Sequence, residues 1–134
     1  MNKVIIITGT RKRAIARATA RAGSGRVKIN GIDINAFTPA LVRERIKEPL
    51  ILAEGLLGKV DVDIVTNGGG INSQAEAARL AAAKVIVEFT KDKKIKESYL
   101  NYDRHLLVAD VRRKETRKPN CHSKARAKRQ KSYR

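Results

Sequence analysis

The chain has 134 residues, a length that suits one compact domain with an extension rather than two domains. Its 30 lysines and arginines against 13 acidic residues give a net charge of +17, and this self-repulsion indicates a polyanionic partner that neutralises it, above all nucleic acid. A membrane surface is the rival partner, but no amphipathic helix with a large apolar face and no lipidation motif supports it. The single cysteine excludes an internal disulfide and favours a reducing compartment, so we expect a cytoplasmic protein.

The first predicted elements are strands. Residues 4–7 form a continuous apolar run, typical of a strand covered on both faces. Residues 13–22 alternate alanine with other residues, and arginine recurs at every fourth position. A helix would gather the arginines on one face, whereas a strand would separate an alanine face from an arginine face. The glycine-rich turn at 23–25 and the alternating segment 26–30 favour a hairpin, so we predict a strand with a buried alanine face.

Helices are predicted in the middle of the chain. Thr38-Pro39 indicates a helix start, with Thr38 as the N-cap and Pro39 at the first helical position. Pro49 is expected to interrupt this helix and to begin a second short one over residues 50–57. The alternation in residues 60–64 then predicts a half-buried strand.

The longest predicted helix covers about residues 72–89, after a turn at 67–70, and a last helix begins at Lys93 and ends at Tyr99 or Tyr102. In the longest helix, the spacing of the apolar residues predicts a buried stripe. The stripe consists of Ile71, Ala75, Ala78, Ala82, Val85 and Phe89.

The character of the chain changes at Arg104. Residues 104–134 hold 12 of the 30 basic residues and two of the 13 acidic ones, a net charge of +10, which leaves +7 for residues 1–103. After Val111 there is little apolar surface to bury, so the segment cannot offset the entropy lost on ordering by itself. We therefore predict a globular domain over residues 1–103 and an extended basic arm over residues 104–134.

The predicted RNA-binding residues lie in two groups of cations. Arginines four apart on a strand lie about 13 Å apart, roughly two phosphate steps, so a row of them can follow an RNA backbone. The alternatives are a solvated face balanced by acids and, for the arm, a nonspecific basic tail or a nuclear-localisation run. The first group is Arg11, Lys12, Arg13, Arg17 and Arg21; the second, in the arm, is Arg112, Arg113, Lys114, Arg117, Lys118, Lys124, Arg126, Lys128 and Arg129.

The string Asn-Gly-Gly-Gly at residues 67–70 precedes the longest predicted helix, where free backbone amides can bind an anion. It lacks the Lys-Ser/Thr of a P-loop and the spacing of a dinucleotide fingerprint. Three interpretations remain open: a tight turn alone, a turn that also binds an RNA phosphate, and a nucleotide-cofactor site.

No catalytic or metal-binding constellation is visible in the sequence. Cys121-His122, with His105 upstream, lacks the four ligands at recurrent spacing that structural zinc needs. Asp61 and Asp63 alternate with apolar residues, which is typical of the wet face of a strand. We expect no enzyme activity, no metal, no cofactor and no small-molecule substrate.

Several motifs, in one order along the chain, resemble a known protein family. They are Gly-Thr-Arg-Lys-Arg-Ala-Ile-Ala-Arg-Ala at 9–18, Gly-Gly-Gly-Ile-Asn-Ser-Gln-Ala-Glu-Ala-Ala-Arg at 68–79, Asp-Arg at 103–104, Asp-Val-Arg-Arg-Lys-Glu at 110–115 and Lys-Ala-Arg at 124–126. The family is the universal small-subunit ribosomal protein numbered nine in bacteria and sixteen in eukaryotes, and the resemblance covers essentially the whole chain. Tyr133 stands where bacterial members have lysine, which is similar to the archaeal and eukaryotic branch, and the short N-terminus favours an archaeal-type member.

The resemblance implies an α/β (α+β) two-layer sandwich with the fold of the second domain of ribosomal protein five, a left-handed β-α-β crossover and an extended basic C-terminal tail. It implies a structural constituent of the small ribosomal subunit that binds rRNA in the head and touches neighbouring head proteins. It also implies that the tail reaches the tRNA in the peptidyl site, where Lys131, Tyr133 and Arg134 would contact that tRNA.

Two alternative functions remain. A DNA-compacting, chromatin-like protein would explain the charge, and co-sedimentation with small ribosomal subunits would discriminate it. A small-molecule kinase is the other, because that enzyme class reuses this fold and has a glycine-rich turn before a helix, and ATP binding at low micromolar levels would support it.

Overall fold

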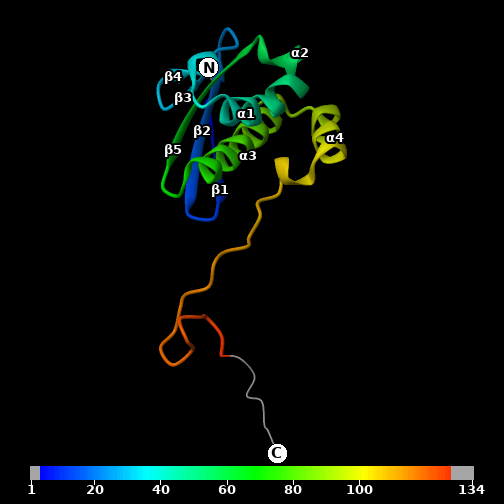
Figure 1. Cartoon of the computed structure of the whole chain (residues 1–134). Coiled ribbons are helices and arrows are strands. Elements are labelled where there is room, and N and C mark those ends of the chain that lie inside the picture. The colour runs from blue at the N-terminus through cyan, green and yellow to red at the C-terminus, as the bar shows by residue number, and fades with distance from the viewer. Residues whose placement is uncertain (1–3, 128–134) are drawn as a thin grey trace, which may run out of the picture.

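A five-stranded sheet with helices packed on it forms the folded part of the chain in the computed structural model, which describes residues 4–127 (Figure 1). The strand order is β1-β2-β5-β3-β4, and only the β3–β5 pair is parallel among the described strands. The strands are β1 (Val4–Arg11), β2 (Ala14–Ala22), β3 (Val27–Ile29), β4 (Ile32–Asp33) and β5 (Val60–Asn67). The α-helices are α1 (Ala40–Leu52), α2 (Glu54–Leu57), α3 (Ile71–Thr90) and α4 (Lys93–Tyr102), with single 3₁₀ turns at Ile34–Ala36 and Arg104–Leu106.

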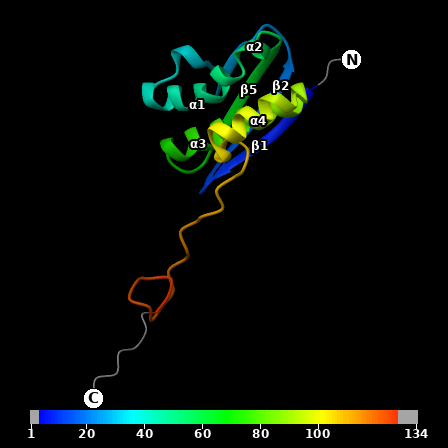
Figure 2. The same cartoon turned by 90° about the vertical axis from the view of Figure 1, so that its right-hand side faces the viewer.

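The mixed α+β class is confirmed, and the layers follow from the strand alternation. Helix α3 packs across β1, β2 and β5, and α1 packs beside α3 on the same side of the sheet (Figure 2). Alternate residues of β2 and β5 are buried under these helices, those of β1 are buried or partly buried, and most of the residues between them are exposed on the opposite face. The prediction that residues 4–7 are covered on both faces is therefore wrong, because Val4 and Ile6 are exposed. Among the helices within residues 4–127, none combines the length and the apolar character of a membrane-spanning segment.

Small side chains bring α3 very close to the sheet. The predicted alanine face of β2 is confirmed at Ala14, Ala16, Ala18 and Ala20, which are fully buried, but Ala22 at the end of the strand is exposed. Arg17 and Arg21 point outward. The facing surface of α3 is also rich in buried alanine, including Ala77 and Ala81. Close packing of this kind leaves no room for a larger side chain at the contact. We refer to this contact as the alanine seam.

Helix α1 differs from the sequence-based prediction in two places. Its N-cap is Pro39 rather than Thr38, and no side chain caps it. Pro49 was expected to end the helix, but α1 continues through it to Leu52. Pro49 is buried there, and its carbonyl accepts a hydrogen bond of 2.6 Å from the hydroxyl of Tyr99 in α4. Packing against α4 therefore stabilises a helical turn that the proline alone disfavours. Burial raises the pKa of Tyr99, so its hydroxyl stays a donor.

The two later helices lie where the periodicity placed them, with one correction. The stripe of α3 is confirmed at Ala75, Ala78, Ala82 and Val85, but Ile71 is 63% exposed because it begins the helix beyond the covered part of the sheet. The buried surface of α3 is also wider than a stripe, since the sheet covers one side and α1 another.

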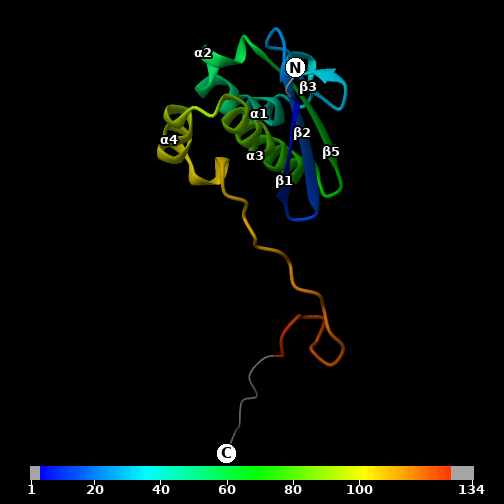
Figure 3. The same cartoon turned by 180° about the vertical axis from the view of Figure 1, so that it is seen from behind.

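The segment after α4 remains packed on the domain for several residues. Leu106, which follows the predicted domain boundary, is fully buried and belongs to the hydrophobic core. The chain then runs past the turn between β1 and β2 and extends away from the domain (Figures 1 and 3). Residues 111–120 are all exposed. The extended character predicted for the arm therefore applies to the described residues after Asp110.

Gly9 in β1 provides a test of the alanine seam. A Cβ at this position would lie 2.8 Å from the amide nitrogen of Ala81, and closer still to the carbonyl oxygen of Ala77. Both are helix backbone atoms that cannot rotate away. We expect Gly9→Ala to lower the free energy of unfolding by about 1–3 kcal/mol, measured by urea denaturation.

Gly55 in α2 supplies the matched control, because a Cβ there would meet nothing within 4 Å. Gly55→Ala should leave stability unchanged or raise it by about 0.5–1 kcal/mol, since alanine has the better helix propensity. Equal stability of the two variants would contradict close packing at the seam.

Candidate nucleic-acid interface

The exposed face of the sheet carries two of the predicted RNA-binding arginines. Arg17 and Arg21 both lie on this face, separated by Thr19. In the register of the sheet, Arg17 stands between Thr8 and Val65 of the neighbouring strands. The face is not purely cationic, because exposed apolar side chains share it: Val4, Ile6, Ile15 and Val65.

The acids of β5 also lie beside these arginines, which the linear sequence did not reveal. Asp61 is the register partner of Arg21, and Asp63 that of Thr19. The Asp61 carboxylate accepts hydrogen bonds from the amides of Arg26 and Ser24, at 2.9 and 2.8 Å. These bonds lower the pKa of Asp61 and fix the loop between β2 and β3. The arginine face is therefore partly balanced by acids from a strand 40 residues away in sequence.

Lys12 and Arg13 occupy the tight turn between β1 and β2 rather than the sheet face. Both are exposed, and Lys12 adopts a left-handed backbone conformation with φ 53°. The predicted continuous row from Arg13 through Arg17 to Arg21 is therefore wrong at its first member, since Arg13 precedes the strand.

Arg11 has a different environment from the other predicted RNA-binding residues. Its side chain is 19% exposed and forms ion pairs with Glu76 of α3 and Asp110. The guanidinium nitrogen that faces Asp110 lies 3.2 Å from the carboxylate. This arginine is thus committed to carboxylates of its own chain, and we do not include it in the proposed RNA-binding surface.

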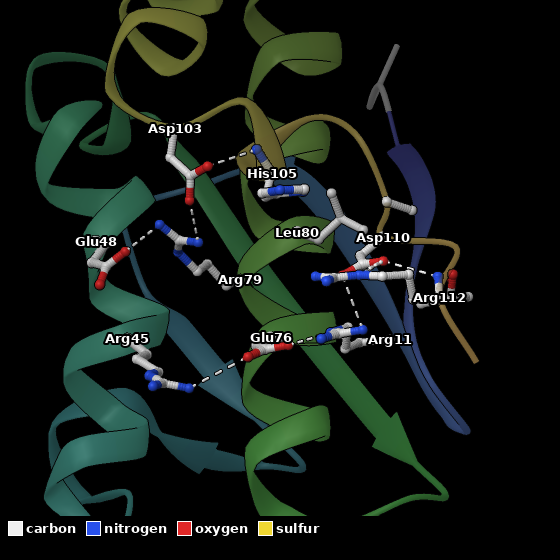
Figure 4. A pocket seen from close by; sticks show the side chains of 12 residues that line it. Arg11, Arg45, Glu48, Glu76, Arg79, Leu80, Asp103, His105, Asp110 and Arg112 are labelled. Atoms are coloured by element: carbon white, nitrogen blue, oxygen red, sulfur yellow. Dashed lines mark hydrogen bonds and ion pairs between the residues drawn. The ribbon is translucent and has the colours of Figure 1, made fainter. Parts of the chain in front are cut away.

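Arg11 belongs to a cluster of arginines and carboxylates that lines a pocket of about 400 Å³ (Figure 4). Arg79 of α3 pairs with Glu48 of α1 and, at 2.9 Å, with Asp103 after α4. Arg45 of α1 lies 3.5 Å from Glu76. The pocket balances four arginines with four acids, so it offers no excess charge to an anion. The members of this arginine–carboxylate cluster are Arg11, Arg45, Glu48, Glu76, Arg79, Asp103, Asp110 and Arg112.

The cluster fixes the beginning of the arm. Burial by itself raises the pKa of Asp103, but hydrogen bonds from the His105 amide and the Arg79 guanidinium outweigh it and leave that pKa below its ordinary value. The Arg112 guanidinium and amide, with Arg11 nearby, hold the pKa of Asp110 well below its usual range. Both carboxylates are therefore charged at neutral pH and tie the start of the arm to α3 and β1. No periodicity signals these pairs, because they join α1, α3, β1 and the arm.

The described part of the arm presents most of its predicted RNA-binding side chains to solvent. Arg126 pairs with Glu115, and the Glu115 pKa is lowered as a result. Backbone hydrogen bonds from Lys118 to Lys124 and from Lys124 to Cys121 close a small loop. The exposed cations in this part of the arm are Arg112, Arg113, Lys114, Arg117, Lys118, Lys124 and Arg126. Lys128, Arg129, Lys131, Tyr133 and Arg134 lie outside the described residues.

Three segments far apart in the sequence meet where the arm passes the domain. Lys12 and Arg13 from the turn between β1 and β2, the glycine turn before α3, and residues 113–117 line one groove. The sequence prediction named its cations but could not place them together. Within residues 4–127, no group of three or more His, Cys, Asp or Glu side chains is arranged to hold a metal ion.

Comparison with known proteins connects these features to a family. The family model described as ribosomal protein S9/S16 matches residues 9–134. A protein named small ribosomal subunit protein uS9 from Methanococcus maripaludis strain C7 is 51% identical over 133 residues, covering 98% of this chain and 99% of its own length. The protein of the same name from Methanococcus vannielii is 50% identical over the same coverage. Both relatives are archaeal, in agreement with the archaeal-type ending of the sequence, and the match extends over nearly the whole chain. The chain therefore belongs to the ribosomal protein S9/S16 family.

Proposed function

We propose that the chain is a structural constituent of the small ribosomal subunit that binds rRNA in the subunit head and reaches the peptidyl-site tRNA with its arm. The names of its relatives support the ribosomal assignment, and the family consists of structural, non-enzymatic ribosomal components. Its place of action is then the small subunit of the cytoplasmic ribosome. Its partners there are rRNA, neighbouring head proteins and, at the tip of the arm, tRNA.

The observation that carries the rRNA assignment is the separation of the charge into paired and unpaired cations. Arg11, Arg45 and Arg79 are paired with carboxylates inside the arginine–carboxylate cluster. By contrast, Arg17, Arg21 and most cations of the arm form no ion pair within residues 4–127. Unpaired cations at this density repel one another, and phosphates of RNA would relieve that repulsion.

The two surfaces suit different parts of folded RNA. The sheet face is rigid, so it can dock against the shape and backbone of an RNA helix. The arm has almost no apolar surface of its own and gains order by lying between RNA strands whose phosphates it neutralises. Specificity would come mainly from RNA shape and from the register set by the domain.

Strands β3 and β5 are parallel neighbours whose connection passes through α1 and α2. We assign this connection as the left-handed β-α-β crossover of the fold named after the second domain of ribosomal protein five. We also propose that the domain extends to about Asp110 rather than residue 103, since Leu106 is in the core and Asp110 pairs with Arg11.

Salt dependence tests the rRNA assignment. If the domain and arm together engage about ten phosphates, log K for rRNA should fall with log salt with a slope of roughly −7 to −9. Arg17→Gln/Arg21→Gln should reduce the magnitude of that slope by about 1.4–1.8, because two phosphate contacts are lost. Filter binding of a small-subunit rRNA transcript over a salt series measures both values.

Lys93→Gln/Lys96→Gln is the matched control, because it removes the same charge from exposed positions on α4, outside both proposed surfaces. Its slope should equal that of the unaltered protein. Arg11→Gln should likewise keep the slope but lower the free energy of unfolding, since Arg11 pairs with Glu76 and Asp110. A flat salt dependence of the unaltered protein would rule out the rRNA assignment.

The tip of the arm has its own test. Deleting Tyr133 and Arg134 should leave assembly into small subunits intact but weaken peptidyl-site tRNA binding modestly, because one or two phosphate contacts are lost. Sucrose-gradient sedimentation measures assembly, and tRNA filter binding to reconstituted subunits measures affinity. Unchanged tRNA affinity would mean that the tip only anchors the arm in rRNA.

A further inference from the structure

A second strongly charged cavity, separate from the arginine–carboxylate cluster, is a groove at the base of the arm. It has a volume of about 800 Å³ and lies between the turn joining β1 and β2, the glycine turn before α3, and residues 113–117. Its cationic lining residues come from both the domain and the arm: Lys12, Arg13, Arg113, Lys114 and Arg117.

The charge of this groove is not balanced by the protein. None of these five cations forms an ion pair within residues 4–127. Glu115, the acidic residue among those that line the groove, is already paired with Arg126. Like charges on the arm and on the domain repel each other across the groove, so an anion between them would stabilise the observed arrangement.

The glycine turn at residues 68–70 forms part of the wall of the groove. Its three glycines are explained by different structural constraints. Gly68 and Gly69 have φ angles of 72° and 67°, and a Cβ on Gly69 would lie 2.9 Å from the amide nitrogen of Ala14. Turn geometry and packing therefore explain both. Gly70 has φ −112°, and a Cβ there would meet nothing within 4 Å. Neither the backbone nor the packing of the protein requires glycine at this position, which opens onto free space.

The backbone next to Gly70 offers donors as well as space. Gly70 is the N-cap of α3, and no side chain caps the helix. The first amide of α3 with a carbonyl partner is that of Gln74, which donates to Gly70. The three preceding amides make no hydrogen bond within residues 4–127, and Ser73, which carries the last of them, lines the groove together with the cations.

We propose that this groove binds the phosphate backbone of one rRNA strand, so that the same phosphates are held by the domain and by the base of the arm. The inference rests on the proposed rRNA-binding function. It adds the place at which the domain and the arm bind the same ligand. RNA bound in the groove would fix the direction in which the arm leaves the domain. The arginine–carboxylate cluster holds the arm up to Arg112, and the shared phosphates continue that hold over residues 113–117.

The test changes the charge of the wall without disturbing the fold. Asparagine and aspartate are both favoured N-cap residues, so Gly70→Asn and Gly70→Asp should both fold with unchanged or higher stability. Gly70→Asp also places a carboxylate beside the bound phosphates. It should lower the association constant for a small-subunit rRNA transcript about tenfold at about 0.1 M salt, whereas Gly70→Asn should lower it about two- to threefold.

Lys93→Gln is the matched control, because it also changes the net charge by −1 but lies on α4, away from the groove. It should change the association constant less than about twofold. If Gly70→Asp and Lys93→Gln have the same small effect while the unaltered protein binds rRNA with a steep salt slope, the groove proposal is wrong and the rRNA assignment stands. If the unaltered protein does not bind rRNA, the proposed function itself fails.

A double-mutant cycle tests whether the domain and the arm share phosphates. Lys12→Gln and Lys114→Gln each remove one cation from opposite sides of the groove. If both contact the same phosphates, their combined effect on rRNA affinity should differ from the product of the single effects by about two- to threefold. Multiplicative effects would refute a shared ligand.

A free nucleotide has the same phosphate chemistry, and ATP titration by calorimetry separates the two sources. We expect no ATP binding tighter than about 1 mM, because a free nucleotide cannot also engage the remaining cations of the arm. ATP binding at low micromolar concentration that is lost in Gly70→Asp would overturn the assignment to rRNA.

Discussion

The alanine seam between α3 and strands β1 and β2 is the constraint on which the rest of the structure depends. Fully buried alanines on β2 and a glycine in β1 let the helix backbone approach the sheet closely. Because strand residues alternate between faces, burying the alanines turns Arg17 and Arg21 outward. The same approach sets the glycine turn before α3 against the turn between β1 and β2, with Gly69 next to Ala14. Close packing thus positions the sheet face and one wall of the groove together.

The cations of this protein perform two physically different tasks. Arg11 and Arg79 are largely buried and hold α1, α3, β1 and the chain after α4 together through carboxylates (Figure 4). A partly buried pair of this kind is costly to break, because removal of one partner leaves the other charge unpaired. Most of the exposed cations within residues 4–127 form no ion pair and remain available to a polyanion, with Arg112 and Arg126 among the exceptions. Net charge alone does not distinguish these tasks, since every arginine contributes equally to the total of +17.

The arm is joined to the domain by a graded connection. Leu106 is anchored by burial in the core, and Asp110 by ion pairs with Arg11 and Arg112. Beyond them, residues 113–117 face the domain across a groove whose charges repel. Along the chain, the arm is thus held first by hydrophobic burial and then by ion pairs. Over residues 113–117 only a bound anion would hold it. Under the proposed function, RNA bound in this groove would fix the direction in which the arm leaves the domain.

The sequence by itself determined the α+β class, the alternating strand β2, the long helix α3, the basic arm and the family. These properties depend on local periodicity, composition and short motifs, all of which are readable along the chain. Only the tertiary structure decided that α1 continues through Pro49, where the carbonyl meets Tyr99. It also decided that Arg11 pairs with Glu76 and that Asp61 lies beside Arg21. These outcomes depend on contacts between residues 40 to 65 positions apart, and no local pattern encodes which distant charges become neighbours when the alanine seam closes.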